Sequence, residues 1–542
     1  MSPILKTLGG FCLAPALWSQ TWDVHLPERW FPRVAAFPGA GAAPDSPSGK
    51  LSLQEALEST LRLHPQARIG EQQVAASRGV LREASGIFDR VYSSGAQQSF
   101  APTPLTTAEQ NPAGGGPKAA ATNLTTFNAS AITLYRNGIT AGPVVELDRA
   151  RDRLSNVAGI NQSRLVYQMT IPLLRNKGAE VVAAQETSAG VQVEASKLDL
   201  NQTFTDLLTN TAVGYWDLVG AIRLLEVALS SEERGQTLVD NVDALVRAER
   251  IPRNDTNEVR ANLADRIAGR IAAEQQVVVA RQQLALAMGL PPEGLASLAE
   301  PAEDLPEGMG APANDPETVK RYIGLALSQR SDYLAARKRV EAARTLLAQA
   351  KNALRPSVNL TLSTGYSGLR EGIYPQSYLV SPFYGVHGMD AIAGVRYEFA
   401  PRNNAAAGRL AQTEASIRQA ELRAADTART IATAVLVALA GVRNAGLRME
   451  KTRESVKAFK AALDGEREKY RLGFGSLVDI LTIEDRLTTS LAIEVQARLD
   501  AAVEMARLRQ ATGTLVEPSA VAPRADGQAF MTLPVPQRHN QP

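Results

Sequence analysis

The chain matches itself at two different offsets along its 542 residues. Residues 57–84 recur 266 positions later as residues 323–350, and residues 247–289 recur 224 positions later as residues 471–513. A repeat of more than 200 residues is too long for a solenoid unit. We therefore predict two homologous halves that together form one duplicated, pseudo-symmetric body.

Composition argues against several classes of protein. With 58 Lys and Arg against 56 Asp and Glu, the formal charge of +2 provides no basic surface for nucleic acid. The one cysteine, Cys12, excludes an intrachain disulfide framework or a cysteine metal site. The four histidines are too scattered along the sequence to predict a metal site, and no cofactor is expected. They are His25, His64, His387 and His539.

The amino terminus has some features of a targeting segment. Lys6 precedes a short apolar run, and Ala14-Pro15-Ala16 offers a cleavage site, so residues 1–16 are a possible signal peptide. The bulky Phe11 before Cys12 argues against lipid attachment there. Residues 17–50 are aperiodic and rich in Pro, Gly and Ala, which indicates a linker or extended arm.

No stretch approaches the roughly 20 apolar residues that a membrane-spanning helix needs. The nearest, residues 431–442, is shorter and is closed by Arg429 and Arg443. Any membrane crossing by this chain is therefore expected to be a closed β-barrel.

Long helices are predicted in both halves. No proline occurs between Pro172 and Pro252 or between Pro401 and Pro518, and both intervals are rich in Ala, Leu, Arg and Glu. A continuous helix over about residues 405–471 would extend about 100 Å. Small residues at its apolar positions favour close lateral packing, as in a tube, stalk or coiled coil.

Each half is expected to begin with a shorter helix, at residues 52–87 and 316–354, before a change to alternating residues predicts strands. These β-regions cover residues 87–171 and 357–400, with a long exposed loop expected at 366–390. Of the 24 Phe and Tyr residues, 13 fall in the two regions. A membrane barrel and a small soluble β-subdomain both fit this local sequence.

The first half is longer than the second. The offset falls from 266 to 229 between Pro172 and Pro401, so about 37 residues are added, most of them expected in residues 101–122. A tight-turn signal at Arg136-Asn137-Gly138-Ile139 suggests an additional hairpin or an extended strand pair, and the number of strands stays open.

These patterns divide the chain as follows. The first repeat covers residues 51–289 with a tip at about 247–255, and the second covers 316–513 with a tip at about 471–479. A Pro, Gly and Glu-rich connector spans 290–315, and the tail at 514–542 is expected to be disordered. Gly289 and Gly513 are predicted to end helices.

The order of elements and the segment Tyr-Arg-Leu-Gly-Phe-Gly-Ser-Leu-Val-Asp-Ile-Leu at residues 470–481 resemble the TolC-like outer-membrane efflux protein family, also called outer-membrane factors. Residues 350–356 and 171–175 resemble other pieces of that family, and the likeness covers roughly residues 51–514. It implies a mainly α protein with a β-barrel part, in which each protomer lends long helices to an α-barrel and strands to a membrane barrel.

The resemblance further implies a homotrimer in the outer membrane, with its helical part in the periplasm. The implied partners are outer-membrane lipid, a periplasmic adaptor (membrane-fusion) protein and an inner-membrane pump. The implied function is the channel of a tripartite efflux or type I secretion system. The alternative is an adaptor or structural protein with a helical-hairpin stalk and no membrane barrel.

Asp255 and Asp479 occupy matching positions just past the two tips, where the family places acidic residues near its periplasmic entrance. In a trimer they would form carboxylate rings that attract cations. The competing interpretation is helix capping, because Ser476 and Asp479 have the spacing of a capping box. Asp255 and Glu258 admit the same interpretation.

Arg247 and Arg471 precede the tips and are candidates for adaptor docking or for pairing with the acidic residues, against simple compensation of the helix dipole. Gly473 and Gly475 are expected to serve the turn itself. The first tip has Glu249 at the position of Gly473. No phosphate-binding or nucleophile motif occurs, so no enzyme activity is expected.

Overall fold

The computed structural model describes most of the chain from residue 49 onward. The described residues are 49–104, 119–151, 158–249, 254–292, 298–308, 310, 315–372, 381, 386–472, 474–516 and 525–534. The possible signal peptide, Cys12 and the predicted arm up to residue 48 lie outside them. The described part belongs to a single compact unit.

Each half begins with two helices and not with the one predicted. His64 and Arg330 have extended backbones, with ψ of 126° and 119°, and each ends one helix and begins the next. Proline at residue 65 fits the first helical position, where no amide hydrogen bond is lost. The four helices are α1 (Leu53–Leu63), α2 (Pro65–Gly86), α6 (Pro316–Gln329) and α7 (Ser331–Asn352).

The long helices are confirmed. α9 contains 68 residues and starts within a residue of the predicted position, and α4 contains 64. Both lie in proline-free intervals, so no residue interrupts their backbone hydrogen bonds. The long helices and the short helix before them are α3 (Ala179–Val182), α4 (Ala184–Arg247), α5 (Asn254–Ala287), α9 (Asn404–Arg471) and α10 (Leu477–Thr512).

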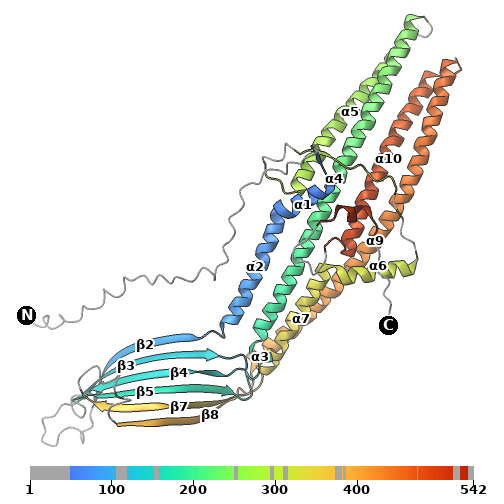
Figure 1. The fold of residues 1–542 in the computed structure, drawn as a ribbon. Coiled ribbons are helices and arrows are strands. Elements are labelled where there is room, and N and C mark those ends of the chain that lie inside the picture. The colour runs from blue at the N-terminus through green and yellow to red at the C-terminus, as the bar shows by residue number, and fades with distance from the viewer. Residues whose placement is uncertain are drawn as a thin grey trace, which may run out of the picture. The chain divides into compact units, whose positions relative to one another are not determined.

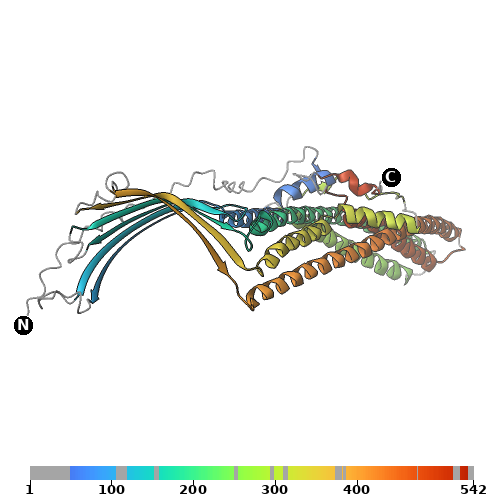
Figure 2. The same ribbon diagram turned by 90° about the horizontal axis from the view of Figure 1, so that it is seen from below.

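The helices form a layer with two lateral edges. α2 and α5 pack on α4, which packs on α7 and α10, and these two pack on α9. One edge of the layer is therefore α2 with α5, and the other is α9 (Figures 1 and 2).

The two sequence offsets meet in one repeated contact. Gly289 and Gly513 end their helices in the left-handed region, with φ of 71° and 68°, as predicted. A Cβ on Gly289 would lie 2.5 Å from the Cα of His64, and a Cβ on Gly513 would lie 2.9 Å from the backbone nitrogen of Arg330. His64 and Arg330 are 266 residues apart, so each half seats its helix-ending glycine against its own helix break. Only glycine fits both the backbone angle and the space.

The strands form one antiparallel sheet of six, in the order β2-β3-β4-β5-β7-β8. The first half contributes four strands and the second half two. The hairpin β3–β4 turns at the predicted site around Gly138 and belongs to the added length of the first half. Of residues 101–122, which were expected to supply most of that length, only 101–104 and 119–122 are described, and they belong to β2 and β3. The strands are β2 (Val91–Pro104), β3 (Ala119–Leu134), β4 (Thr140–Arg151), β5 (Ile160–Pro172), β7 (Ser357–Glu371) and β8 (Val386–Glu398).

The prediction of a long loop at residues 366–390 is wrong at both ends. β7 continues to Glu371 and β8 begins at Val386. The Gly and Ser residues that suggested a loop pair across the strands, and the Ser367 hydroxyl donates to the Asp390 carboxylate over 3.1 Å. Small polar residues can belong to a strand when one face of the sheet is polar.

The connector between the halves joins the core. β6 (Glu300–Pro301) pairs in parallel with β1 (Lys50–Leu51), so Lys50 is part of the fold and not of the predicted arm. The buried Tyr215 hydroxyl donates to the Leu51 carbonyl and to the Glu303 carboxylate. Tyr215 also packs edge-on against Trp216, with ring centroids 5.3 Å apart. Both rings are fully buried in the largest apolar cluster.

Part of the tail predicted to be disordered is ordered. Residues 527–531 form a 3-10 helix, and Phe530 is 2% exposed within the same apolar cluster as Leu51 and Leu53. Arg509 donates to the Thr532 carbonyl over 2.9 and 3.0 Å. The buried Phe530 and these hydrogen bonds hold the segment on the fold, and an aperiodic sequence gives no sign of such contacts. Residues 517–524 and 535–542 lie outside the described part.

Among the described helices, α9 is long and apolar enough to cross a membrane by length and composition alone. Its most apolar 18-residue window has a mean hydropathy of 1.5 and is 33% buried. This apolar stretch is longer than the one at residues 431–442 that the sequence analysis identified. The buried side chains of that region, including Ile431 and Val435, pack against Tyr322 and Leu508. A single such helix is weak evidence for a membrane span.

Candidate functional site

The six-stranded sheet has two chemically different faces. Successive side chains in a strand point to opposite faces, and residues paired across strands share a face. One face is apolar on every strand and includes ten large side chains that are 37–74% exposed. They are Tyr92, Phe100, Phe127, Leu165, Tyr167, Leu362, Tyr366, Met389, Val395 and Tyr397.

The opposite face is mostly polar and carries a row of charges. The Arg164 guanidinium lies 3.4 Å from a Glu146 carboxylate oxygen and 3.3 Å from one of Asp390. These groups come from β4, β5 and β8, and Ser, Thr, Asn, Gln and Gly fill most of the remaining positions. The apolar exceptions include four side chains that are 37–78% exposed, namely Val91, Leu369, Val386 and Ile392. A sheet with one exposed apolar face and one charged face suits lipid on one side and water on the other.

The tip between α9 and α10 is a tight turn that exposes apolar side chains. Phe474 is 87% exposed, Leu472 58% and Val478 51%. The Phe474 amide donates to the Lys469 carbonyl over 2.9 Å. A Cβ on Gly475 would lie 2.8 Å from the backbone nitrogen of Tyr470, so this turn requires glycine at 475 for close backbone approach.

The structure describes several of the predicted tip residues. Asp479 is exposed in the first turn of α10. The pKa of Lys469 is raised mainly by its hydrogen bond to Glu466, and the negative charge of Asp479 raises it further. Ser476 caps the helix by accepting from the Val478 amide over 3.2 Å, so the capping is by serine and does not use the predicted box.

The two predicted arginines have local partners. Arg471 pairs with Glu468 through contacts of 2.7 and 2.9 Å, and not with an acidic residue beyond the turn. Arg247 donates to the Asp243 carbonyl one turn earlier, over 3.2 Å. Both side chains are exposed and sit in the last turn of their helices.

Two of the candidates lie outside the description. They are Gly473 and the side chain of Asp255, so the pairing of Asp255 with Asp479 stays a prediction. Before the first tip, Glu249 has a φ of 58°, which is the left-handed conformation that favours glycine. Glu249 is the residue that replaces glycine when the first tip is compared with the second at the 224-residue offset.

A cluster of buried charges behind the tips was missed by the sequence analysis. Arg266 on α5 is 6% exposed and lies 3.0 Å from Glu484 on α10, which is 1% exposed. Arg467 on α9 reaches the same carboxylate at 2.6 Å, and Asp485 lies 3.2 Å from Arg266. Burial also lowers the pKa of the nearby Arg234 on α4, and the charge of Glu484 partly offsets this effect. The charged side chains of this cluster therefore come from all four long helices.

The repeat offset contained a signal for this cluster. Arg467 and Glu484 correspond, 224 residues earlier, to Asp243 and Arg260, which also form an ion pair, with a separation of 3.0 Å. In the first half the acid is on the longer helix and the arginine on the shorter one, and in the second half the two are exchanged. The first-half pair is 25% and 61% exposed, whereas Glu484 is enclosed. Only the tertiary structure shows which of the two pairs is buried.

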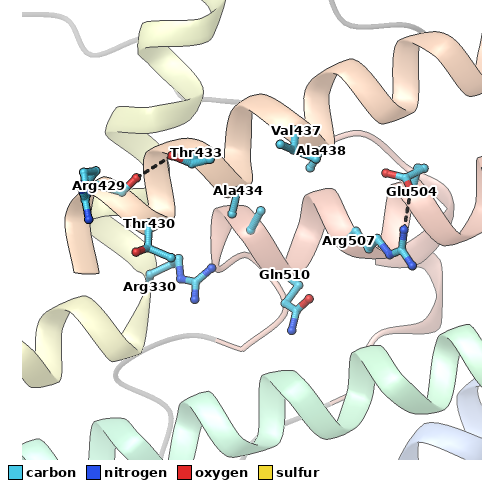
Figure 3. Close-up of a pocket in the computed structure, with 11 residues that line it drawn as sticks. Arg330, Arg429, Thr430, Thr433, Ala434, Val437, Ala438, Glu504, Arg507 and Gln510 are labelled. Atoms are coloured by element: carbon cyan, nitrogen blue, oxygen red, sulfur yellow. Dashed lines mark hydrogen bonds and ion pairs between the residues drawn. The ribbon is translucent and has the colours of Figure 1, made fainter. Parts of the chain in front are cut away.

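A pocket lies between the start of α7 and helices α9 and α10 (Figure 3). This pocket has a volume of about 690 Å³ and three arginines on its wall. Each of them already has an acidic neighbour, since Arg507 pairs with Glu504 at 2.7 Å, Arg330 with Asp332 and Arg429 with Asp426. The pocket therefore has little capacity left for binding an anion.

Long helical hairpins joined to a sheet with one apolar and one polar face are the architecture found in outer-membrane channels. The family model described as outer membrane efflux protein matches residues 322–514. The outer membrane protein TolC of Escherichia coli (strain K12) is 22% identical over 385 residues, covering 68% of this chain and 73% of TolC.

Solved structures share the fold. The outer membrane protein VceC of Vibrio cholerae has a TM-score of 0.59 and 17% identity, with 85% of this chain and 96% of that chain covered. The CmeC outer membrane channel of Campylobacter jejuni has a TM-score of 0.61 and 14% identity, with 89% and 90% covered. The resemblance to TolC-like outer membrane efflux proteins inferred from the sequence is therefore confirmed by the family model, by TolC and by the solved structures.

Proposed function

We propose that this chain is the outer-membrane channel of a tripartite efflux or type I secretion system and acts as a passive conduit for exported substrates. The observation that carries the proposal is the apolar face of the sheet, which has large exposed side chains on five of the six strands. Tyr92, Tyr366 and Met389 on that face are each more than half exposed. The alternative, an adaptor or stalk protein with a soluble β-subdomain, would leave this surface in water.

The assembled channel is a homotrimer whose helices form one tube in the periplasm and whose strands form one barrel in the outer membrane. Exposed apolar stripes at both lateral edges of the helical layer support the assembly. Each stripe follows helical spacing, so its members lie on one face. The stripes are Ile69, Val80 and Ile87 on α2, Ile271, Val278 and Leu286 on α5, and Leu422, Leu436 and Leu447 on α9.

The tip between α9 and α10 is the part of the chain that meets a periplasmic adaptor, which in turn connects to an inner-membrane pump. Its support is the exposed apolar group Leu472, Phe474 and Val478 on a turn flanked by the charged Arg471 and Asp479. Apolar side chains ringed by charge are typical of protein-binding surfaces.

The gate lies at the same end of the helices. In a trimer, Asp255 and Asp479 from three copies form rings of carboxylates that attract cations and narrow the passage. Behind them, the charge cluster around Glu484 ties the hairpin α4–α5 to the hairpin α9–α10. The tip stays closed while this cluster is intact.

Membrane fractionation, heat-modifiable gel mobility and planar-bilayer recording test the proposal. We expect a heat-sensitive trimer in the outer-membrane fraction with a small, cation-selective conductance. Recovery as a soluble monomer would favour the stalk alternative.

The gate has its own test. Asp255→Ala combined with Asp479→Ala should raise the conductance or weaken block by divalent cations, whereas Glu450→Ala, an exposed acid far from the tip on α9, should not. Unchanged conductance and selectivity in the double variant would remove the carboxylate rings from the mechanism.

A further inference from the structure

The sheet and the helical layer end at the same two lateral edges. Within the described residues, β2 pairs only with β3, and β8 only with β7. α2 leads directly into β2, and β8 leads directly into α9 (Figure 1). One edge of the chain is therefore α2, α5 and β2, and the other is α9 and β8. Both edges carry the exposed apolar helix stripes described above.

Neither edge strand is protected against pairing. β8 is 13 residues long and contains no proline or lysine, and β2 has 14 residues with its prolines only at the end far from the helices. A long, unprotected edge strand can pair with a further strand through its free backbone groups, so natural proteins interrupt, cover or pair such edges. A second copy of this chain would bring both missing partners at once.

The direction of the edge strands permits closure. All neighbouring strands are antiparallel, so with an even number of strands β2 and β8 run in opposite directions. β8 of one copy can therefore pair with β2 of the next in the same antiparallel manner. A head-to-tail contact of this kind closes a ring when the rotation between copies is right.

The register within one chain already has the stagger of a barrel. The row of partners that starts at Ser93 on β2 ends at Asp390 on β8, through Ser130, Val144, Val166 and Gly365. Ser93 is two residues from the helix-proximal end of β2, but Asp390 is eight residues from that end of β8.

This shift of six residues over five strand spacings fixes the tilt of the strands. If the helix-proximal ends are level, it corresponds to a tilt of about 40°. Membrane barrels have strand tilts of about 35–45°. The sheet is also curved and not flat (Figure 2).

We propose that β2 of one copy pairs with β8 of the next, so that the trimer closes a single barrel of eighteen strands, six from each chain. This inference rests on the proposed function, because it assumes three copies in a membrane. It adds how many strands line the pore and which part of the chain sets that number.

The hairpin β3–β4 raises the contribution of each chain from four strands to six, and it is firmly built into the fold. Its turn is held on the start of the helical layer. The Asn137 carbonyl accepts from the Gly178 amide over 3.0 Å, and Arg136 pairs with Glu186 at 2.7 Å while stacking on Phe88 at 4.7 Å. The extra strands are therefore part of the barrel wall.

The strand number decides the width of the pore in the membrane. With strands about 4.8 Å apart and tilted by about 40°, eighteen strands give a backbone radius of about 18 Å, against about 12 Å for twelve. The wider barrel leaves a water-filled lumen, which the inward charges Glu146, Arg164 and Asp390 require.

Disulfide crosslinking tests which edges meet. In a Cys12→Ser background, Ser93→Cys is combined in turn with Gly394→Cys, Arg396→Cys and Glu398→Cys, which lie on the same face near the helix-proximal end of β8. Oxidised outer membranes should give covalent dimers and trimers for at least one pair. The matched control Ser93→Cys with Ser130→Cys, whose hydroxyls lie 2.8 Å apart, should link only within a chain.

The outcomes separate this proposal from the proposed function. If the protein conducts as a membrane trimer and the control pair links, but all β2–β8 pairs give only monomers, the edge pairing is wrong and the channel function stands. If no trimer or conductance is found, both fail. Averaged axial images of the trimer in lipid should show a barrel about 36 Å across its backbone, and a width of about 24 Å would also overturn the proposal.

Discussion

Removing the carboxylate of Glu484 is expected to destabilise the helical part substantially. Glu484 is 1% exposed and forms ion pairs with Arg266 at 3.0 Å and with Arg467 at 2.6 Å. In Glu484→Gln, Arg266 stays 94% enclosed without its main counter-charge, although Asp485 remains at 3.2 Å. Breaking one side of a buried ion pair costs about 3–5 kcal/mol, and the partly exposed Asp485 favours the lower value of about 3 kcal/mol.

The thermal shift follows from the size of the protein. Unfolding the roughly 430 residues that the structure describes carries an entropy of about 0.9 kcal/mol per kelvin, so about 3 kcal/mol corresponds to a fall of about 3 °C in the midpoint. Circular dichroism at 222 nm on the detergent-solubilised protein measures this midpoint.

Two further variants isolate burial as the cause. Asp243→Asn breaks the repeat-related pair with Arg260, which is partly exposed, and should cost less than about 1 kcal/mol. The double variant Arg266→Met with Glu484→Leu removes both charges and should recover most of the loss. Equal shifts for Glu484→Gln and Asp243→Asn, or no recovery in the double variant, would refute the reasoning.

Three other predictions follow from backbone angles and burial. Gly513→Ala places a Cβ 2.9 Å from the Arg330 nitrogen at a φ of 68° and should cost about 1–3 kcal/mol, whereas Gly465→Ala, in open space on α9, should stabilise by about 0.5–1 kcal/mol. Glu249→Gly should relieve the left-handed φ of 58° and stabilise the first tip by up to about 1 kcal/mol in chemical unfolding. Burial raises the pKa of Asp217, so its favourable contribution is present only at low pH and is lost as pH rises through its folded pKa. Asp217→Asn should therefore gain stability relative to the native chain as pH rises, and a difference that does not vary with pH would contradict this.

Local sequence was sufficient for the long helices and for most strands. Proline-free, alanine-rich intervals predict α4 and α9 because helix formation depends on nearby residues. Prediction from local sequence failed where a residue acts through a contact with a distant part of the chain. Pro65 is a local sign of the helix break at His64, but no proline follows Arg330, where the break lies against Gly513. Likewise, Phe530 packs in a core made by residues far away in the sequence.

Some residues of the candidate site could likewise be predicted from the sequence, and others could not. Repeat positions identified the two tips and the unusual Glu249, since a turn imposes its own backbone requirements on the residues that form it. They did not identify the cluster around Glu484, because its charges come from four helices and are separated by up to about 250 residues. The burial that makes them important arises only when the two hairpins pack together.

By itself, the sequence determined that this protein is a duplicated body of long helices with a strand region in each half, since periodicity and proline spacing are local properties of the chain. Only the tertiary structure decided that six strands form one sheet, that its apolar sides coincide on one face, and that the free edges of sheet and helices coincide. Those properties depend on register and packing between segments far apart in the chain. A shift of one residue in a strand would exchange the two faces without changing the composition.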